Sequence, residues 1–416
     1  MEHSVAQWVA TIDGVLRSWW SRHRVSVLRF AIMVMSVAAL IWLAYESWRL
    51  LWQQGYWGAI DLRVYYGLIR DWFAGRPIYA EIRNAMHPPA TYLILWPFLG
   101  WLSVTAARWL WAVTTVAMLG WLVRLVVRES RADTPLERAF MALVPLSMYA
   151  TGATIGNGQL TIHLLPPLVF GLMLLCSKES GLGKEFLGAA LFLLALAKPT
   201  VSAPFFWIVL FSTGRLRAVL YVVFGYVGLT LFATSFQESS IPMLFRDWLA
   251  NPGIELRGVS NLKAWLGSVG LKQWSFPATT LALAALGLWT YRHRQVNLWL
   301  LLGVSALVAR MWTYHHWYDD LLILLPMVAL FRIAKEGPSD GSDLLAGVLF
   351  AISVIVMLTP GGLYLFPSPW KTVYLTGQVV VWFAVLFFLL DQAKRENARS
   401  SADHMSRRLT PMRGWL

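Results

Sequence analysis

A short polar segment between two long apolar runs carries the residue whose position best suits acid–base chemistry. The segment spans 58–89, and Asp61 lies in it directly after the first apolar run. A carboxylate at the edge of the hydrocarbon is partly desolvated, which makes it a stronger base. The alternative role is an N-cap for a helix over 62–73, because Asp accepts backbone N–H bonds there. An acid at membrane depth favours catalysis over capping.

Ionisable side chains inside apolar runs are costly, so each of them is a candidate functional residue. Lys198 interrupts Leu-Ala-Leu-Ala-Lys-Pro-Thr, His163 follows Gln159 by four residues, and Arg310 ends an apolar run. The spacing of four predicts that Gln159 and His163 share one helix face. Cations and neutral donors in a low-dielectric cavity suit a lipid-linked phosphate. Two alternatives remain open: Lys198 snorkels to an interface, or His163 is simply a buried histidine with satisfied hydrogen bonds.

The pattern His-His-x-x-Asp-Asp covers His315, His316, Asp319 and Asp320. On a helix this spacing pairs each histidine with the acid four residues later. We favour a hydrogen-bonded phosphate-binding pair, with structural packing as the alternative. A metal site fits poorly, because only two histidines and two acids on adjacent faces are present. No P-loop, dinucleotide fingerprint or nucleophile elbow occurs, so nucleotide-driven chemistry is disfavoured and we expect no metal and no cofactor.

The composition requires membrane helices to position these residues. Of the 416 residues, 57% are hydrophobic and 14% are charged, which is more apolar surface than a soluble domain can bury. The net charge of +13 comes from Arg and Lys in short loops and at the termini. The positive-inside rule accounts for that distribution, so no nucleic-acid partner is expected. The single cysteine, Cys176, excludes an intrachain disulfide.

Thirteen apolar runs predict an all-α polytopic membrane protein, a bundle of about 12 transmembrane helices with several short or broken members. The basic loops place both termini in the cytoplasm, and an odd number of spans cannot join two termini on the same side. One of the thirteen runs therefore fails to span the membrane. The run 88–104, which begins with Pro-Pro, is the first candidate, and the broken 138–176 region is the second. We expect one transmembrane domain over 1–395 and a cytoplasmic polar tail over 396–416. The expected helix breakers are Gly156, Gly158, Pro166, Pro167 and Pro199.

Amphipathic helices are expected in two of the outer loops, 53–87 and 236–276. In each loop apolar residues recur at helical spacing. We expect both helices to lie on the outer leaflet, and packing against the membrane bundle is compatible with that placement. The apolar faces consist of Leu62, Tyr65, Tyr66, Ile69, Trp72 and Phe73 in the first loop, and of Ile241, Leu244, Phe245, Trp248 and Leu249 in the second.

Several motifs resemble those of glycosyltransferase family 87, whose members include actinobacterial mannosyltransferases of the phosphatidylinositol mannoside and lipomannan pathways. The family's first periplasmic loop is similar to Asp61-Leu62-x-Val64-Tyr65-Tyr66, Gly75-x-Pro77-Ile78-Tyr79 and His87-Pro88-Pro89. Its later motifs are similar to Asn157-Gly158-Gln159-Leu160, Ala197-Lys198-Pro199 and His315-His316. The chain departs from the family pattern at two places that bear on which sugar and acceptor are used. His87 stands before Pro88-Pro89, where the family usually has an aromatic residue, and Val259-Ser260-Asn261-Leu262 only approximates the family's Asn-Gln-Ser-Leu motif.

The resemblance implies a membrane-embedded fold of the third glycosyltransferase type (C-type), with Asp61 as general base. Such an enzyme transfers a sugar, here expected to be mannose, from a polyprenyl-phosphate donor to a lipid- or glycan-linked acceptor, with inversion and without metal. The residues expected to bind the donor phosphate are Lys198, Arg310, His315, His316 and His163. The residues expected to contact substrate are Arg63, Tyr65, Tyr66, His87, Asn157, Gln159, Trp312, Arg257 and Lys263.

Two other classes of protein remain open at this point. A flippase or transporter of lipid-linked sugars also needs cavities and broken helices, but it does not need Asp61 as a base. A ligase or polymerase that uses an undecaprenyl-diphosphate donor needs arginine and histidine clusters in a late outer loop, and the 236–276 loop contains no histidine. In each case we expect a multi-pass protein of the inner (plasma) membrane, surrounded by membrane lipids, with its site facing the periplasm or outside.

Overall fold

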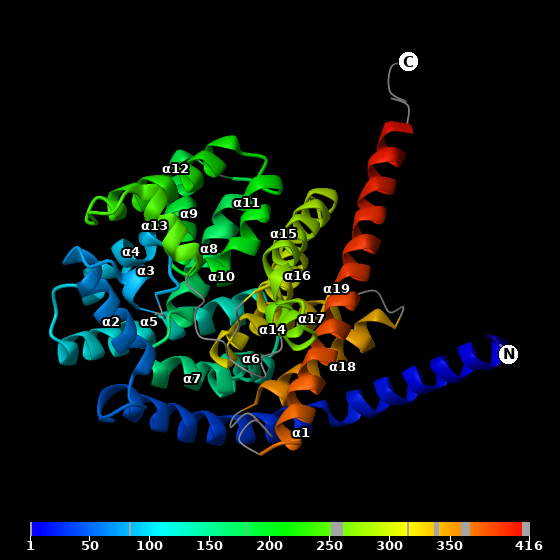
Figure 1. Ribbon diagram of the computed structural model, residues 1–416. Coiled ribbons are helices and arrows are strands. Elements are labelled where there is room, and N and C mark those ends of the chain that lie inside the picture. The colour runs from blue at the N-terminus through cyan, green and yellow to red at the C-terminus, as the bar shows by residue number, and fades with distance from the viewer. Residues whose placement is uncertain are drawn as a thin grey trace.

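The computed structural model describes residues 2–82, 85–179, 181–250, 261–313, 316–336, 341–358 and 367–409. The all-α prediction is confirmed, because these residues form helices and no strand (Figure 1). The helices are α1 (Glu2–Leu51), α2 (Ile60–Phe73), α3 (Ile78–Glu81), α4 (Pro89–Leu99), α5 (Val104–Glu129), α6 (Pro135–Ser147), α7 (Tyr149–Asn157), α8 (Thr161–Cys176), α9 (Leu182–Ala195), α10 (Pro199–Ser202), η1 (Ala203–Phe205), α11 (Phe206–Phe211), α12 (Leu216–Thr234), α13 (Ile241–Ala250), α14 (Leu262–Ser268), η2 (Lys272–Trp274), α15 (Ser275–Arg292), α16 (Leu298–Met311), η3 (Trp317–Ile323), α17 (Leu324–Glu336), α18 (Ser342–Met357) and α19 (Trp370–Leu409).

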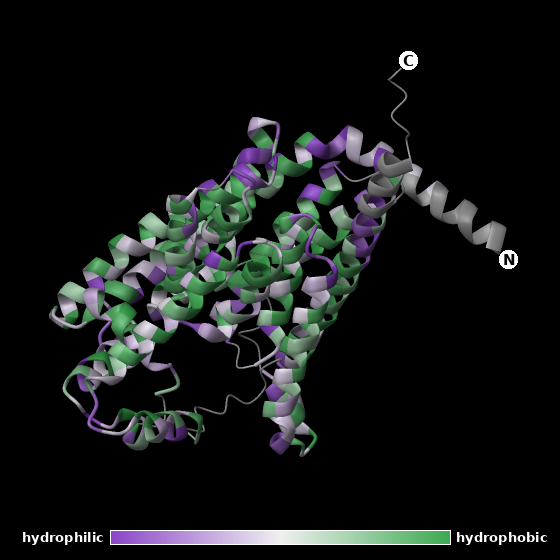
Figure 2. Ribbon diagram, turned by 90° about the horizontal axis from the view of Figure 1, so that it is seen from above, coloured by the Kyte–Doolittle hydropathy of each residue, from purple (hydrophilic) through white to green (hydrophobic). Residues whose placement is uncertain are grey.

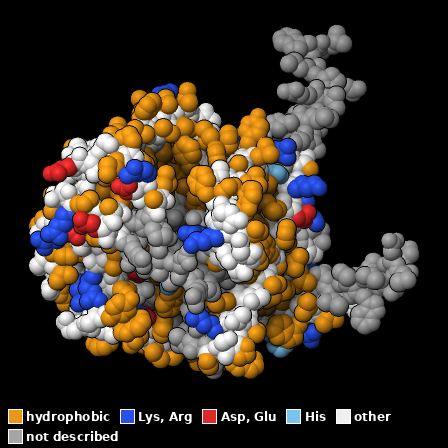
Figure 3. Space-filling model, in the orientation of Figure 1, with side chains coloured by type: hydrophobic (Ala, Val, Ile, Leu, Met, Phe, Trp, Pro, Cys, Tyr) orange, Lys and Arg blue, Asp and Glu red, His pale blue; other side chains and the backbone are white. Residues whose placement is uncertain are grey.

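Within the described residues, four helices are long and apolar enough to cross a membrane: α1 over Gly14–Leu51, α5, α12, and α19 over Trp370–Arg399. Hydrophobic residues predominate in the helices of the bundle (Figure 2), and hydrophobic side chains cover much of the face of the molecule shown in Figure 3. On α5, for example, Val113 and Val116 are 63% and 72% exposed, as expected for side chains that face lipid. The chain is therefore a membrane protein.

The expected number of about 12 spans is not confirmed, because several apolar runs form shorter or bent elements. The pairs α7–α8 and α9–α10/α11 bend by 118° and 119°, and counting each pair as one span gives at most six spans in the described residues. The run 88–104, our first candidate for a run that fails to span, forms α4 of only 11 residues. An 11-residue helix is about 16 Å long, roughly half the thickness of the hydrocarbon core.

Two of the five expected helix breakers lie at the bends. Gly158 ends α7 in the left-handed conformation with φ 68°, and Lys198 precedes Pro199, which disfavours helical backbone at residue 198. The prediction was wrong for Pro166 and Pro167, which lie inside the continuous helix α8, and for Gly156, which lies inside α7. A proline in a helix removes one hydrogen bond, but close packing on neighbouring helices can maintain the helix.

The first outer helix is present as α2, and its apolar face packs against protein. Leu62, Tyr65, Ile69 and Trp72 are buried, and α2 contacts α4. The indole Nε1 of Trp72 donates to the carbonyl oxygen of Ala233 at 2.9 Å, which anchors α2 to the end of α12. Packing on the bundle, rather than insertion into a leaflet, therefore accounts for this apolar face.

Basic loops expected in the cytoplasm meet at one end of the bundle. Nζ of Lys335 lies 2.8 Å from a carboxylate oxygen of Glu137, and Nη1 of Arg332 donates to the carbonyl oxygen of Glu129 at 2.6 Å. These contacts join α17, α6 and the last residue of α5. At the other end of this 26-residue helix, Arg108 in the second turn of α5 donates to the carbonyl oxygen of Gln53, in the loop that precedes α2. The polar segment of Asp61 is therefore at the opposite end of α5 from these basic loops.

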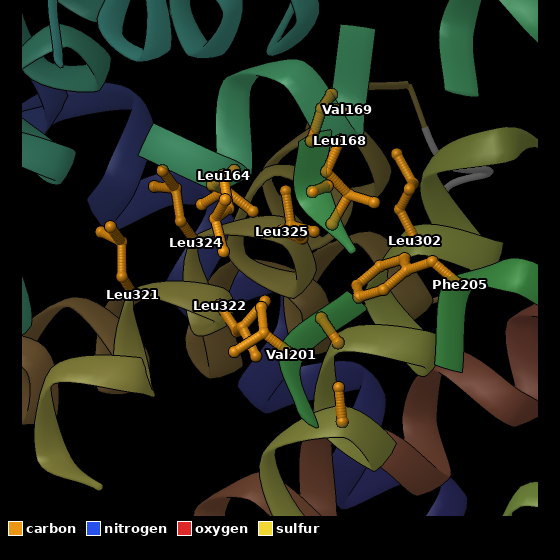
Figure 4. Close-up of a cluster of buried hydrophobic side chains, with 14 of the residues drawn as sticks. Leu164, Leu168, Val169, Val201, Phe205, Leu302, Leu321, Leu322, Leu324 and Leu325 are labelled. Atoms are coloured by element: carbon orange, nitrogen blue, oxygen red, sulfur yellow. The ribbon is translucent and has the colours of Figure 1, made fainter. Parts of the chain in front are cut away.

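Buried aliphatic and aromatic side chains fill the space around the two bends. Figure 4 shows this cluster, in which side chains of α8, α10, η1, α16, η3 and α17 pack together. Its labelled members are Leu164, Leu168, Val169, Val201, Phe205, Leu302, Leu321, Leu322, Leu324 and Leu325. The cluster holds the two broken segments together, and these segments carry the polar residues described next.

Candidate active site

The two helix bends bring together residues that are far apart in the sequence. Oε1 of Gln159, in the bend between α7 and α8, accepts a hydrogen bond from Nζ of Lys198 at 3.3 Å. Lys198 itself lies in the bend between α9 and α10, which is held by a 2.8 Å hydrogen bond from Thr91 to the carbonyl oxygen of Ala197. Broken helices at membrane depth are tolerated where they are buried in protein or line a cavity. The two bends therefore bring the polar side chains of Gln159 and Lys198 together inside the bundle.

The start of α2 packs directly against the first bend. Gly158 has no side chain, and a Cβ there would lie 2.5 Å from Cβ of Leu62. The amide of Ala59 donates to the carbonyl oxygen of Gly156 at 3.2 Å. Ala59 is also the N-cap of α2, in a left-handed conformation with φ 49°. Asp61 is thus the second residue of the helix, and the N-cap alternative for Asp61 is wrong.

Lys198 forms a buried ion pair with an acid of the His-His-x-x-Asp-Asp pattern. Its Nζ lies 2.6 Å from Oδ1 of Asp319, and the two side chains are 4% and 2% exposed. The same carboxylate oxygen accepts a 2.7 Å hydrogen bond from Thr161. Nζ also lies 4.8 Å from the ring centre of Tyr318, a cation–π contact. The snorkelling alternative for Lys198 is therefore wrong, because its charge is buried and paired.

Asp61 lies within the electrostatic reach of this cluster. Burial raises the pKa of Asp61 to about 6, while a hydrogen bond with Gln159 and the charge of Lys198 act to lower it. The negative charge of Asp319 raises the pKa further, and the charge of Arg49 lowers it. Oδ2 of Asp61 is buried and has no hydrogen-bond partner among the described residues. This oxygen can accept a proton from a substrate hydroxyl, and a pKa near 6 leaves most of the carboxylate ionised at neutral pH.

Tyr65 and His87 lie beside this group. The hydroxyl of Tyr65 donates to Oε1 of Gln159 at 3.1 Å, and its ring centre lies 5.1 Å from that of His87. Burial, followed by the charge of Lys198, lowers the pKa of His87, so the imidazole is neutral at pH 7. The neutral ring of His87 and the hydroxyl of Tyr65, which contacts Gln159, can provide hydrogen bonds to a sugar without adding charge.

Arg310 belongs to a second buried network. Its Nε donates to Oδ1 of Asp320 at 2.9 Å, and the hydroxyl of Tyr149 donates to Oδ2 of the same acid. Nε2 of Gln378 donates to the Tyr149 hydroxyl at 3.0 Å. These bonds tie together α16, η3, α7 and α19. The acids of the pattern therefore pair with cations from other elements. His316 precedes η3 in an extended conformation, so the prediction that it shares a helix with Asp320 was wrong. The ring of His316 instead stacks on Tyr318, with ring centres 4.4 Å apart.

Asn157 is held by a buried charge pair from α1. Nη2 of Arg49 donates to Oδ1 of Asn157 at 2.9 Å, and Nη1 lies 2.6 Å from a carboxylate oxygen of Glu46. Sequence reasoning missed Arg49 and Glu46. The available signal was an acid and a base three residues apart at the end of the first apolar run, a spacing that brings side chains together on a helix. Asp319 was recognised in its motif, but its role as the partner of Lys198 was missed.

Other expected site residues lie in other surroundings. His163 contacts α5, where its Nε2 forms a 3.0 Å hydrogen bond with Thr114. Gln159 precedes α8, so the prediction that it shares a helix face with His163 was wrong. Trp312 donates from its indole to the carbonyl oxygen of Thr200 at 2.9 Å and so holds α10. Tyr66 donates to the carbonyl oxygen of Leu102 at 3.0 Å.

Four further expected residues complete the comparison. Arg63 donates to the carbonyl oxygen of Tyr56 at 2.8 Å, in the loop before α2. Lys263 lies on the short helix α14 and is half-buried. His315 and Arg257 lie outside the described residues.

A family model places the chain among known proteins. Residues 86–320 match glycosyltransferase family 87. The matched range contains both helix bends and the acids at 319 and 320, and it begins after Asp61 and α2. No curated protein and no solved structure matches the chain. Because the match covers more than half of the 416 residues and the apolar helices require a membrane, the chain belongs to glycosyltransferase family 87 and is a membrane glycosyltransferase.

Proposed function

We propose that the protein transfers mannose from a polyprenyl-phosphate donor to a lipid- or glycan-linked acceptor, with Asp61 as the general base. The observation that carries the proposal is the buried Oδ2 of Asp61, which has no hydrogen-bond partner in the described part of the chain, on a carboxylate whose pKa burial raises to about 6. Oδ2 takes the proton of the acceptor hydroxyl while the hydroxyl oxygen of the acceptor bonds to the anomeric carbon of the donor sugar. The bond from that carbon to the phosphate oxygen breaks, and polyprenyl phosphate leaves with the electron pair. A β-linked donor then gives an α product.

The donor phosphate is proposed to lie near Lys198, whose charge acts on Asp61 more strongly than that of Arg49. Preorganised positive charge stabilises a leaving phosphate without protonating it. The ammonium group is held by Asp319 and Gln159, so it needs no reorganisation when the donor arrives. His316 stacks on the Tyr318 ring that faces this ammonium and is a second proposed phosphate contact. Arg310 fixes η3 through Asp320, and we assign it a supporting role.

The acceptor is proposed to enter from the outer side of the inner membrane. Two observations support this orientation: the basic loops gather at the other end of α5, and positive loops favour the cytoplasm. Gln159 hydrogen-bonds to Asp61, Tyr65 contacts Gln159, and His87 contacts Tyr65; these three residues are the proposed sugar contacts. Arg257 and Lys263 of the later outer loop remain proposed contacts for the acceptor head group.

The donor class can be tested with purified protein in nanodiscs. The acceptor is a lipid extract from a deletion strain, which accumulates the unmodified acceptor. The donors are polyprenyl-phosphate mannose, the corresponding diphosphate-linked sugar and GDP-mannose. We expect transfer only from the monophosphate donor, with an α linkage by NMR. Transfer from GDP-mannose or from the diphosphate would overturn the proposed donor, and a β product would overturn inversion.

A further inference from the structure

A second positively charged site lies in the loop over 52–59, in front of α2. Arg108, in the second turn of α5, is only 9% exposed and donates from Nη2 to the carbonyl oxygen of Gln53 at 3.0 Å. The loop closes tightly around this guanidinium, because a Cβ on Gly58 would lie 2.9 Å from Nη2 of Arg108. Nε of Arg108 is buried and has no hydrogen-bond partner in the described part of the chain.

Arg63 contributes a second guanidinium to the same loop. Its Nη2 donates to the carbonyl oxygen of Tyr56 at 2.8 Å, and its Nε is also buried without a partner among the residues described. The charge of Arg63 acts on Arg108, so the two groups are close enough to repel each other. Over the described ranges neither arginine has an acidic partner, and their hydrogen bonds go only to backbone carbonyls. Two neighbouring cations, one buried and one half-buried, without an acidic partner among the described residues favour binding of an anion.

The surroundings of this pair indicate that the anion belongs to a lipid. Four large aromatic side chains of the loop and of α5 are exposed, as is typical of a membrane–water interface; they are Trp52, Tyr56, Trp57 and Trp109. Trp109, Val113 and Val116 are exposed at positions i, i+4 and i+7 of α5. They form an apolar stripe that begins beside Arg108 and continues into the membrane, where an acyl chain can lie against it.

We propose that Arg63 and Arg108 bind the phosphate of a lipid head group, whose acyl chain packs on the α5 stripe of Trp109, Val113 and Val116. The two planar guanidinium groups can each donate two parallel hydrogen bonds to phosphate oxygens. The aromatic side chains hold the rest of the head group at the interface. The site goes beyond the transfer reaction proposed above and does not need Asp61 to act as a base. It would hold a phosphate-bearing lipid two residues along α2 from the catalytic carboxylate.

The test uses purified full-length protein in neutral detergent, titrated with phosphatidylglycerol that carries a fluorophore on its acyl chain. Arg63→Gln and Arg108→Gln each remove one charge. Arg76→Gln is the matched control, because Arg76 is an exposed outer arginine paired with Asp71 at 3.0 Å. We expect each test variant to bind phosphatidylglycerol at least about tenfold more weakly, as expected for a lost charge-assisted bond, and the control to bind as the wild type does.

Stability and competition measurements make the test decisive. Without lipid, Arg108→Gln should unfold at the same or a higher temperature, because it removes an uncompensated buried charge. Unchanged phosphatidylglycerol affinity in both test variants, or an equal loss in Arg76→Gln, would overturn the proposal. Inorganic phosphate that binds as tightly as the lipid would overturn the assignment to a lipid head group. Asp61→Asn should keep the lipid affinity, so a failure of the transfer mechanism leaves this result intact.

Discussion

Asp61 acquires its proposed chemistry from residues that the sequence places far away. Burial makes its carboxylate harder to ionise, and Gln159 and Lys198 partly reverse that effect. Asp319 compensates Lys198 while adding a second negative charge near Asp61. The balance leaves the pKa of Asp61 near 6, high enough for a good base and low enough for ionisation at neutral pH.

The pH dependence of turnover should report this balance. Because the base must be ionised, turnover should rise with pH and become level above about 6, the pKa of Asp61. Asp319→Asn removes a negative charge that raises this pKa and frees the charge of Lys198, which lowers it. The acid limb of the pH–rate profile should therefore move to lower pH. An unchanged limb would show that a group other than Asp61 controls the profile.

The sequence identified several of these residues individually but not their pairing. Asp61 and Lys198 stood out because charged groups are rare at membrane depth. Lys198 and Asp319 are 121 positions apart, and local periodicity contains no signal for which distant helix supplies a counterion. The same reasoning overlooked Glu46 and Arg49, although their spacing of three residues pairs them once the first helix is extended through both.

At the scale of elements, the site depends on two helices that stop in the middle of apolar runs. The break at Lys198 follows from Pro199, and the break at Gly158 follows from a left-handed backbone conformation that glycine adopts readily. Both breaks could be predicted from residue type. Pro166 and Pro167 show the limit of that prediction, because tertiary packing keeps α8 helical through both.

Lys198 joins the second bend to η3, and its variants should separate stability from catalysis. Lys198→Met leaves the carboxylate of Asp319 buried without its cation, which should destabilise the fold by about 3–5 kcal/mol. The double variant Lys198→Met with Asp319→Leu removes both charges and should unfold at close to the wild-type temperature. If Lys198 holds the donor phosphate, the double variant should still lose donor affinity and turnover. A stable double variant with wild-type donor affinity would remove Lys198 from phosphate binding.

Gly158 sets the distance between the first bend and α2. In Gly158→Ala the new Cβ would lie 2.5 Å from Cβ of Leu62, at a backbone φ of 68° that Ala rarely adopts. Because displacement of a reacting group by about 1 Å can cost 10²-fold in rate, we expect a loss of turnover of that order. Gly67→Ala on α2 is the control, since its Cβ meets no atom within 4 Å. Equal turnover in the two variants would contradict the positioning role of Gly158.

At the scale of the molecule, the described helices have two chemically different ends. At one end, Arg332 and Lys335 of α17 contact α5 and α6, and at the other end lies α2 with Asp61. Composition was enough to predict an all-helical membrane protein. The expected number of about 12 spans is not confirmed, because hydropathy counts an apolar run as a span even when it forms an 11-residue helix or half of a bent pair.

The orientation can be measured by cysteine labelling in a Cys176→Ala background. Gln54 lies in the loop before α2, and Arg294 follows α15, and both residues are exposed. In spheroplasts, an impermeant maleimide should label Gln54→Cys directly and Arg294→Cys only after permeabilisation, because positive loops stay in the cytoplasm. The reverse pattern would place Asp61 in the cytoplasm.

The central claim is that Asp61 takes the acceptor proton, and a single-turnover comparison of two asparagine variants tests it most directly. Asp61→Asn should reduce the transfer rate by about 10²–10⁴-fold, the usual contribution of a general base, while donor affinity and thermal stability stay near wild type. Asp71→Asn is the control on the same helix, because Asp71 pairs with Arg76 and should turn over normally. An Asp61→Asn enzyme that keeps more than a tenth of the wild-type rate would contradict this mechanism.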